Sequence, residues 1–241
     1  MRPGDSERLS IIVPVYNEAA TIAAVVERLL SIDLPVPREL IVINDGSTDG
    51  TRVVLDGLRG RSPLLAIVHE ETNRGKGHAV RLGFARATGS IVAIQDADLE
   101  LDPAQLALLV APILAAETDV VYGSRFLSGP TSAPALSRAA NRGLTAITNL
   151  LYRSSLTDME TCYKIMRIEV ARSLTLAANR FDIEPEITAR LLLGGHRILE
   201  RPVTFSPRSR AAGKKIGWRD GVMAIRVLLR HRLQPRPRGN R

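Results

Sequence analysis

An apolar run, a polar tip and an amphipathic segment follow one another three times in the first 90 residues, and this alternation narrows the possible folds most. The apolar runs Leu9–Val15, Glu39–Ile43 and Leu64–Val68 have the β-branched content of buried strands. The segments after them place apolar residues three and four apart, as on one face of a helix: Ala19–Leu30, Thr51–Leu58 and the stretch through Val80 to Ala87. Alternating strands and helices predict an α/β fold in which helices flank a mixed, mostly parallel central sheet.

The fourth apolar run, Ile91–Ile94, leads directly into a group of acidic residues. Asp96, Asp98 and Glu100 follow it at every second position. In an open α/β sheet, ligands bind outside the carboxyl ends of the strands. Carboxylates are the hard oxygen ligands that Mg²⁺ or Mn²⁺ uses when it is shared with substrate phosphates. The alternative is a solvated acidic turn, and the rest of the chain must decide between the two.

Polar residues also end the first three runs. Gly75-Lys76-Gly77 fits neither of two phosphate-binding motifs, because a P-loop needs Ser or Thr after Gly-Lys and a dinucleotide fingerprint needs glycine where Val80 stands. Glu18 and Asp45 follow the first and second runs and are polar enough to hold a base and a ribose. Singly, each is more often part of a plain turn.

The second half of the chain is less regular. Asp102-Pro103 has the sequence of a helix N-cap followed by proline at the first helical position, which predicts a helix over Ala104–Ala116. A short strand at Asp119–Tyr122 ends in Gly123-Ser124-Arg125. The remaining predicted elements are a helix at Leu136–Tyr152, a helix near Glu184–Leu193 and a strand at Ile198–Phe205.

Basic and acidic residues are unevenly distributed along the chain. Residues 1–205 hold 22 Lys and Arg against 24 Asp and Glu, whereas residues 206–241 hold 11 against 1. We therefore predict one catalytic domain over 1–205 and a basic tail over 206–241 that contributes a loop to the site, then an amphipathic helix and a disordered end. The tail is compatible with a nucleic-acid-binding module, but only Trp218 could supply a stacking platform there.

Several structural features are excluded by residues and segments that the sequence lacks. The single cysteine, Cys162, excludes an internal disulfide and a cysteine-based zinc site, and it is compatible with a reducing cytoplasm. No apolar run approaches the roughly 20 residues of a membrane-spanning helix. We also expect no N-terminal signal peptide.

Five of these segments, taken in order, resemble the motifs of family 2 glycosyltransferases with the GT-A fold. They are Pro14–Glu18, Asn44–Thr51, Asn73–Gly77, Asp96–Glu100 and Gly123–Arg125. Two further segments are similar to the dolichol-phosphate mannosyltransferase branch of that family: Asp158–Lys164, and the Arg-x-x-Gly-Lys-Lys element at Arg210–Lys215. The resemblance extends from Leu9 to Trp218 and implies a single GT-A, Rossmann-like domain.

The resemblance implies a site for a GDP- or UDP-sugar and a divalent ion, Mg²⁺ or Mn²⁺. It implies Pro14, Tyr16, Glu18 and Asp45 at the nucleoside, Asp96, Arg125, Arg208, Arg210 and Lys214 at the diphosphate, and Asp96, Asp98 and Glu100 at the metal. Such groups suit the reaction, because glycosyl transfer places negative charge on the departing diphosphate. The sequence departs from the branch at Glu100, where Gln is usual, and this adds a charge beside the metal.

Two classes of acceptor are compatible with the sequence. A hydroxyl acceptor needs a general base, for which the candidates are Asp158 and Glu160. A lipid phosphate is already anionic and needs none, and Asp158 would then orient neighbouring groups. Arg138 and Arg142 lie one turn apart on a predicted helix and suit a phosphate, so we favour the lipid phosphate.

The tail bears on the same choice. On a helix over Gly217–Leu233, one face carries Trp218, Val222, Ile225 and Leu229, and Arg219, Arg226 and Arg230 lie beside it. Such a helix suits the interface of an anionic membrane. A helix docked on the protein's own core would show the same apolar face.

We therefore expect a metal-dependent, inverting glycosyltransferase that moves a sugar from a nucleotide diphosphosugar to a polyprenyl phosphate. Its expected location is the cytoplasm, peripherally bound at the inner face of the cell membrane. The alternatives are transfer to a soluble or polymeric hydroxyl acceptor and, in another class, a nucleic-acid-binding module that uses the basic tail.

Overall fold

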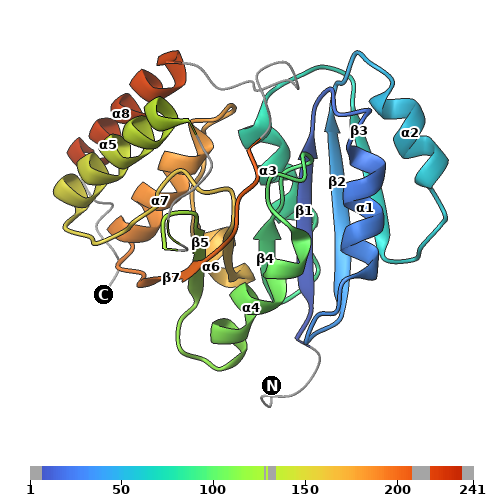
Figure 1. Ribbon diagram of the computed structural model, residues 1–241, viewed down its shortest axis with the longest axis horizontal. Coiled ribbons are helices and arrows are strands. Elements are labelled where there is room, and N and C mark those ends of the chain that lie inside the picture. Colours follow the sequence, from blue (N-terminus) through green and yellow to red (C-terminus); the bar gives the residue numbers. More distant parts are fainter. Residues whose placement is uncertain (1–6, 128, 130–133, 208–217, 235–241) are drawn as a thin grey trace.

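A seven-stranded sheet forms the centre of the protein, in the order β3-β2-β1-β4-β6-β5-β7 (Figure 1). The computed structural model describes residues 7–127, 129, 134–207 and 218–234. The strands are β1 (Leu9–Val15), β2 (Arg38–Asp45), β3 (Leu65–Glu70), β4 (Ile91–Ile94), β5 (Val120–Ser124), β6 (Lys164–Arg167) and β7 (Ile198–Pro202). Only β6 runs antiparallel to its neighbours, which confirms the predicted mixed, mostly parallel sheet.

Strand β1 lies at the middle of the parallel part, between β2 and β4. Ile11, Ile12 and Val13 are fully buried, and so is the whole of β4. Strands covered on both faces read as continuous apolar runs, which is why the sequence made them recognisable.

Helices cover both faces of the sheet. Helices α1 and α4 lie on one face, and α3 and α6 on the other (Figure 1). The helices are α1 (Ile22–Ser31), α2 (Thr51–Leu58), α3 (Lys76–Arg86), the 3₁₀ helix η1 (Pro103–Gln105), α4 (Leu106–Leu114), α5 (Ala135–Tyr152), α6 (Ile168–Ser173), α7 (Ile183–Leu193) and α8 (Trp218–Leu233). The predicted N-cap is confirmed, because the Asp102 side chain accepts a hydrogen bond from the Ala104 amide at 3.0 Å.

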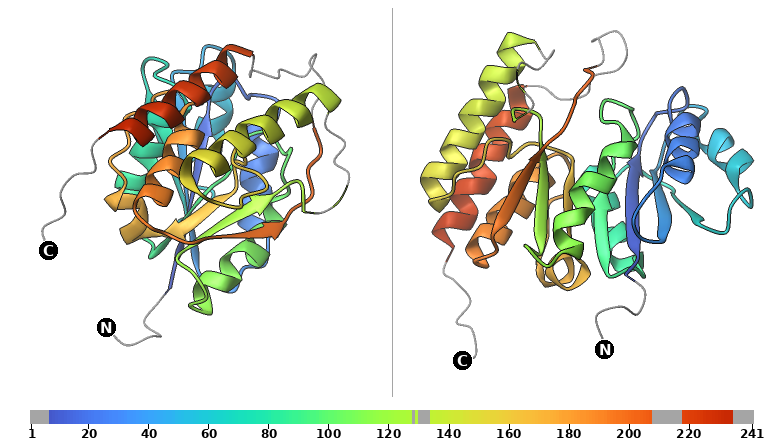
Figure 2. Two further views of the ribbon diagram at one scale, coloured as in Figure 1. Left: turned by 90° about the vertical axis from the view of Figure 1, so that its left-hand side faces the viewer. Right: turned by 60° about the horizontal axis from the view of Figure 1, so that its bottom comes forward.

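Helices α5, α7 and α8 form a cluster at the β5–β7 end of the sheet, where α5 and α8 lie side by side (Figure 2). Helix α8 docks through Ala224, Leu228 and His231, all of which are buried. Its opposite side keeps Val222 and Leu229 at the surface, with 40% and 42% of each residue exposed. The helix therefore docks on the protein by one narrow face, while part of the predicted apolar face remains open to solvent.

No helix in the described ranges combines the length and the apolarity needed to cross a membrane.

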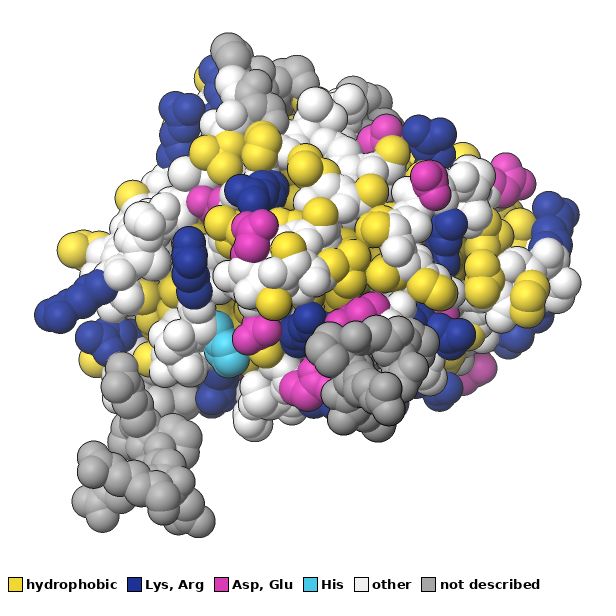
Figure 3. Space-filling view, turned by 90° about the horizontal axis from the view of Figure 1, so that it is seen from below, with side chains coloured by type: hydrophobic (Ala, Val, Ile, Leu, Met, Phe, Trp, Pro, Cys, Tyr) yellow, Lys and Arg dark blue, Asp and Glu magenta, His cyan; other side chains and the backbone are white. Residues whose placement is uncertain are grey.

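Figure 3 views the end of the molecule where the parallel strands begin. Acidic and basic side chains are interspersed there.

The carboxyl ends of the parallel strands meet at one edge of the sheet, which is the upper edge in Figure 1. Because β6 is antiparallel, its first residue, Lys164, lies at the same edge. The polar tips after β1, β2, β4 and β5 therefore converge with the segment that precedes β6. This is the edge at which an open α/β sheet binds ligands.

Substitutions at two helical glycines would test how tightly α3 packs on the sheet. A Cβ atom at Gly83 in α3 would clash with the Ile12 side chain, whereas one at Gly57 in α2 would meet open space. We expect Gly83→Ala to lower the free energy of unfolding by about 1–3 kcal/mol through overpacking. Gly57→Ala should raise it by up to about 1 kcal/mol, because alanine favours the helix. Urea denaturation measures both changes, and equal effects of the two substitutions would contradict this packing.

Candidate active site

Hydrogen bonds tie the polar tips of neighbouring strands into one surface. The Asn17 amide donates to Ser47 Oγ at 3.0 Å, and the Thr48 amide donates to Asn17 Oδ1 at 2.8 Å. Asn17 itself has a φ of 53°, in the left-handed region that asparagine tolerates. The Thr21 hydroxyl donates to the Ala97 carbonyl at 2.7 Å, which joins the first tip to the acidic segment.

Asp45 fastens the segment before α3 to the end of β2. Its carboxylate is only 2% exposed and accepts the amides of Arg74 and Gly75 at 2.9 and 2.6 Å. The nucleoside contacts expected of Asp45, and of the partly exposed Pro14, Tyr16 and Glu18, remain predictions. What the structure adds is a positioning role for Asp45, because it sets the loop that precedes Lys76.

The two glycines around Lys76 allow a close approach of backbone rather than a phosphate cradle. Gly75 has a φ of 99°, and side chains at Gly75 and Gly77 would clash with the carbonyl oxygens of Asn179 and Ala178. The His78 amide donates to the Asn179 carbonyl at 3.2 Å. This packing holds the first turn of α3 in place and directs Lys76 toward the acidic segment.

Lys76 lies between two carboxylates. Its Nζ is 2.7 Å from Asp96 Oδ1 and 2.9 Å from Glu184 Oε1. The other oxygen of Glu184 is 2.5 Å from Lys164 Nζ, so the four charges alternate in sign. Burial alone would lower the pKa of Lys76, but the attraction of Asp96 and then of Glu184 raises it well above its ordinary value.

Sequence reasoning missed Lys76, Lys164 and Glu184 as site residues. Lys76 stood inside a motif that was singled out, and that position was the available signal. Glu184 reaches the site from α7, far away in the sequence, and no local pattern marks it.

A strained turn follows Asp96. Asp98 Oδ1 accepts the Glu100 amide at 3.1 Å, and Leu99 between them has a φ of 57°. A bulky side chain is uncommon in this left-handed region, and such strain gathers at functional sites. The turn fixes Asp98 and Glu100 just beyond Asp96.

The acidic segment suits a metal that is shared with a substrate. Within the described ranges, no three His, Cys, Asp or Glu side chains are grouped closely enough to hold a metal ion by themselves. Mg²⁺ is commonly held by one or two carboxylates together with substrate phosphates, so the donor set fits such an ion. Asp96 already faces one cation, the Lys76 ammonium group. The assignment of Asp96, Asp98 and Glu100 as metal ligands stays a prediction.

Arg125 and Asp158 form a buried, two-pronged ion pair at the same edge of the sheet as the acidic segment. Arg125 Nε and Nη2 each lie 2.7 Å from an Asp158 oxygen, and the Arg125 amide donates to the same carboxylate at 3.0 Å. The Asp158 side chain is fully buried. Because both oxygens of Asp158 already accept hydrogen bonds from Arg125, the geometry suits the expected orienting role of Asp158 better than a role as base.

Aromatic rings and a second carboxylate hold this pair in place. The Arg125 guanidinium lies over the rings of Phe126 and Phe205, at 5.9 and 5.3 Å from their centroids. Glu200 accepts the amides of Thr157 and Asp158. The Nη1 group of Arg125 takes no part in the contact with Asp158, which uses Nε and Nη2, and it is the group suited to a substrate oxygen.

Glu160, the other candidate base, has a carboxyl oxygen that no described side chain engages. Its Oε1 is buried and has no hydrogen-bond partner among the described residues. Burial raises the pKa of Glu160 to about 7, and attraction to Lys164 offsets only part of that effect. A carboxyl group with this pKa can exchange protons near neutral pH.

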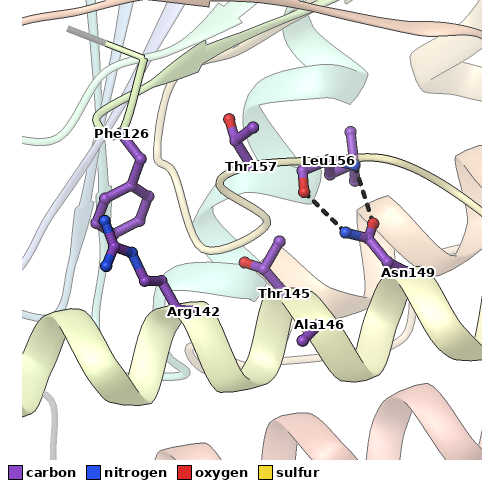
Figure 4. Close-up of a pocket in the computed structure, with 7 residues that line it drawn as sticks. All are labelled: Phe126, Arg142, Thr145, Ala146, Asn149, Leu156 and Thr157. Atoms are coloured by element: carbon purple, nitrogen blue, oxygen red, sulfur yellow. Dashed lines mark hydrogen bonds between the residues drawn. The ribbon is translucent and has the colours of Figure 1, made fainter. Parts of the chain in front are cut away.

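A pocket of about 330 Å³ opens beside the Arg125–Asp158 pair. Its walls include Phe126, Arg142, Thr145, Ala146, Leu156 and Thr157. Figure 4 shows the Arg142 side chain against the Phe126 ring, with the guanidinium 5.5 Å from the ring centroid. Asn149 fixes one wall by bonding both the amide and the carbonyl of Leu156.

The structure separates the two arginines predicted for an acceptor phosphate. Arg142 lines the pocket, whereas Arg138 lies one turn earlier on α5 and is not part of its walls. The other basic residues assigned to the site, Arg208, Arg210 and Lys214, lie outside the described residues.

The chain is similar to curated enzymes that act on prenyl phosphates. It is 29% identical over 232 residues to undecaprenyl-phosphate mannosyltransferase of Micrococcus luteus, covering 91% of this chain and 92% of that protein. It is 30% identical to dodecaprenyl-phosphate galacturonate synthase of Rhizobium johnstonii, covering 88% of this chain. The chain spans 63% of that synthase and 33% of a further relative, a glycosyltransferase of Haloferax volcanii.

A solved structure agrees with the fold. Glucosyl-3-phosphoglycerate synthase from Mycobacterium tuberculosis, solved with Mn²⁺, UDP and phosphoglyceric acid, matches with a TM-score of 0.72 and 22% identity. The match covers 97% of this chain and 81% of that one, and it shows the GT-A fold.

The sequence model described as Glycosyl transferase family 2 matches residues 10–175, which is more than half of the chain and includes the tips of β1, β2, β4 and β5. The chain therefore belongs to glycosyl transferase family 2.

Proposed function

We propose that this enzyme transfers a sugar from a GDP- or UDP-sugar to a polyprenyl phosphate, with Mg²⁺ or Mn²⁺ bound at Asp96 and Asp98. The observation that carries the proposal is the placement of Arg125. Its guanidinium stands over the ring of Phe205, and the next residue, Ser206, donates its amide to the Glu100 carbonyl of the acidic segment. On the other side, Phe126, which follows Arg125 in the chain, lines the pocket that presents a second arginine, Arg142. Arg125 and Arg142 could each bind a phosphate group, so the site suits two phosphorylated substrates.

The donor side of the site is built to receive a diphosphate. Asp98 lies in a fixed turn, and Lys76 supplies a positive charge next to Asp96. A divalent ion bound by these carboxylates would stabilise the charge that develops on the departing diphosphate. Arg125 can donate further hydrogen bonds to the same oxygens, because Asp158 engages only one side of its guanidinium.

The acceptor side favours a phosphate over a hydroxyl. Arg142 presents a positive charge in the pocket, and the Thr145 and Thr157 hydroxyls lie on its walls. Apolar walls from Phe126 and Leu156 suit the first carbons of a prenyl chain. A phosphate oxygen that attacks the sugar carries its own negative charge, so the site requires no general base.

The relatives support this acceptor. The Micrococcus luteus and Rhizobium johnstonii enzymes are named for undecaprenyl and dodecaprenyl phosphates, and a Mycolicibacterium smegmatis relative, 28% identical, is a polyprenol monophosphomannose synthase. A hydroxyl acceptor remains the second candidate, because Glu160 offers a carboxyl group with a pKa near neutrality.

A lipid acceptor requires contact with a membrane, and α8 offers a surface for it. Val222, Leu229 and Leu233 are exposed on the side opposite the docked face, and Arg226 is exposed among them. We propose that this side lies in the interface of an anionic membrane at its cytoplasmic face, with the arginine toward the headgroups.

The metal proposal is tested at Asp98. We expect Asp98→Asn to lower Mn²⁺-dependent turnover by at least about tenfold, an increase of about 1.4 kcal/mol in the barrier. Glu117→Gln is the control, because the Glu117 side chain is 51% exposed and lies in the segment before β5, away from the acidic residues, and its turnover should stay within about threefold of wild type. Turnover of Asp98→Asn within threefold of wild type would remove Asp98 from the metal site.

The acceptor class is tested by comparing Asp158→Asn with Glu160→Gln. For a phosphate acceptor, Asp158→Asn should lower turnover by about 10²-fold or more because Arg125 loses its orientation. Glu160→Gln should keep turnover within a few fold at pH 8. For a hydroxyl acceptor, wild-type turnover should rise with pH through about 7, and Glu160→Gln should abolish this rise. For a phosphate acceptor, any rise follows the ionisation of the acceptor phosphate and should persist in Glu160→Gln. The pH–rate profiles of the three proteins decide between the classes.

The same carboxyl group predicts a change in stability with pH. The pKa of Glu160 is about 7 in the folded protein, above its ordinary value of 4.5, so the folded state holds this proton more tightly than the unfolded state does. Its contribution to stability is therefore lost as pH rises from about 4.5 to about 7. Glu160→Gln should match wild type near pH 4 and exceed it by about 1–3 kcal/mol at pH 8. Urea denaturation at the two pH values measures the difference, and a constant difference would contradict the raised pKa.

The membrane surface is tested by substitution rather than truncation, because α8 also packs on the protein. Val222→Gln combined with Leu229→Gln should weaken binding to phosphatidylglycerol vesicles by at least about tenfold, since each lost apolar contact costs on the order of 1 kcal/mol. Val53→Gln is the control, because Val53 is 76% exposed on α2, at the other end of the sheet. Wild-type binding should also weaken between 0.1 and 1 M salt. Equal binding by the double variant and the control would refute the proposed surface.

A further inference from the structure

The first carboxylate of the acidic segment is already neutralised from within the protein. Lys76 Nζ lies 2.7 Å from Asp96 Oδ1, and only 12% of the Lys76 side chain is exposed. The ammonium group therefore holds one of the oxygens that the proposed metal ion would use. In a partly buried site, a fixed positive charge so close to a ligand repels a divalent ion strongly.

The charges around Lys76 balance. Asp96 and Glu184 contribute two negative charges, and Lys76 and Lys164 contribute two positive ones, through contacts of 2.5–2.9 Å. The Lys164 and Glu184 side chains are 0% and 5% exposed, so solvent screens this group only weakly. A balanced group offers little net attraction for a free divalent ion.

We infer that Lys76 is an internal counter-ion that competes with the divalent ion for Asp96, so that the ion binds weakly alone and tightly together with the anionic donor. This inference rests on the proposed metal site at Asp96 and Asp98. Glu184 makes the exchange feasible, because it contacts Lys76 at 2.9 Å and retains this partner when Asp96 turns to the metal.

A nucleoside diphosphate restores the charge balance that the ion disturbs. Its negative oxygens can accept hydrogen bonds from Lys76 while they also bind the metal. Each ligand then improves the site for the other, and by linkage the metal must raise the affinity for the nucleotide by the same factor as the nucleotide raises the affinity for the metal.

The test measures Mn²⁺ binding by electron paramagnetic resonance, with the metal alone and with saturating UDP or GDP, on the full chain. Lys76→Met makes the group of charges net negative, so it should tighten binding of Mn²⁺ alone by about tenfold. Glu184→Gln makes the group net positive and should weaken that binding by about threefold or more. Lys76→Arg keeps the charge and should stay within about twofold of wild type.

Opposite shifts in Lys76→Met and Glu184→Gln support the counter-ion, because a loss of folding would weaken binding in both. Thermal unfolding of each variant checks that it is folded, and the near-isosteric Glu184→Gln keeps the test decisive if Lys76→Met is unstable. Unchanged affinity for Mn²⁺ alone in Lys76→Met, or a weakening in Glu184→Gln of less than about twofold, would overturn the inference. Failure of the proposed metal site looks different, because wild type would then bind no Mn²⁺ even with UDP or GDP present.

Discussion

The parallel pairing of β1 with β2 and β4 is the constraint on which the rest of the structure depends. It places three carboxyl ends side by side, so polar residues that are far apart in the sequence meet at one edge. The tips are then close enough to form direct hydrogen bonds, as the Thr21 hydroxyl does with the Ala97 carbonyl. The reversal of β6 adds Lys164 to the same edge, because an antiparallel strand begins where its neighbours end.

The parallel half of the fold was predictable from the sequence because each of its elements carries its own periodicity. Strand β1 and helix α2 have the boundaries that the apolar patterns predicted. The direction of β6 and the short helix α6 were not predicted. Four strand residues and six helical ones are too few to establish a period, and pairing with β4 and β5 decides their conformation. Helix α8 was predicted along its length, but its docked face was not, because Ala224 and His231 lack the size and apolarity that mark a buried stripe.

The sequence predicted site residues where a motif follows a strand. It could not predict the partners that those residues acquire through tertiary contacts. The sequence pointed to Arg125 and Asp158 individually, and the structure shows that they form one buried unit. Asp45 was expected at a nucleoside, yet both of its oxygens accept backbone amides. Glu184 carried no signal, because a glutamate in the first turn of a helix is ordinary and only folding brings it to Lys76.

The basic residues at the site are paired with carboxylates, in keeping with the near balance of 22 basic and 24 acidic residues over residues 1–205. Lys76, Lys164 and Arg125 each contact a carboxylate, so these residues add little net positive charge for two phosphorylated substrates. Removing one partner of such a buried pair would leave an uncompensated charge, which is costly, so the pairs are suited to holding geometry. Under the proposed function, the missing positive charge must come from the divalent ion and from residues 206–241, where 11 basic residues face 1 acidic residue. Under the same proposal, the negative charge of the donor is balanced only when the divalent ion is bound with it, because the paired basic residues of the site supply geometry rather than net charge.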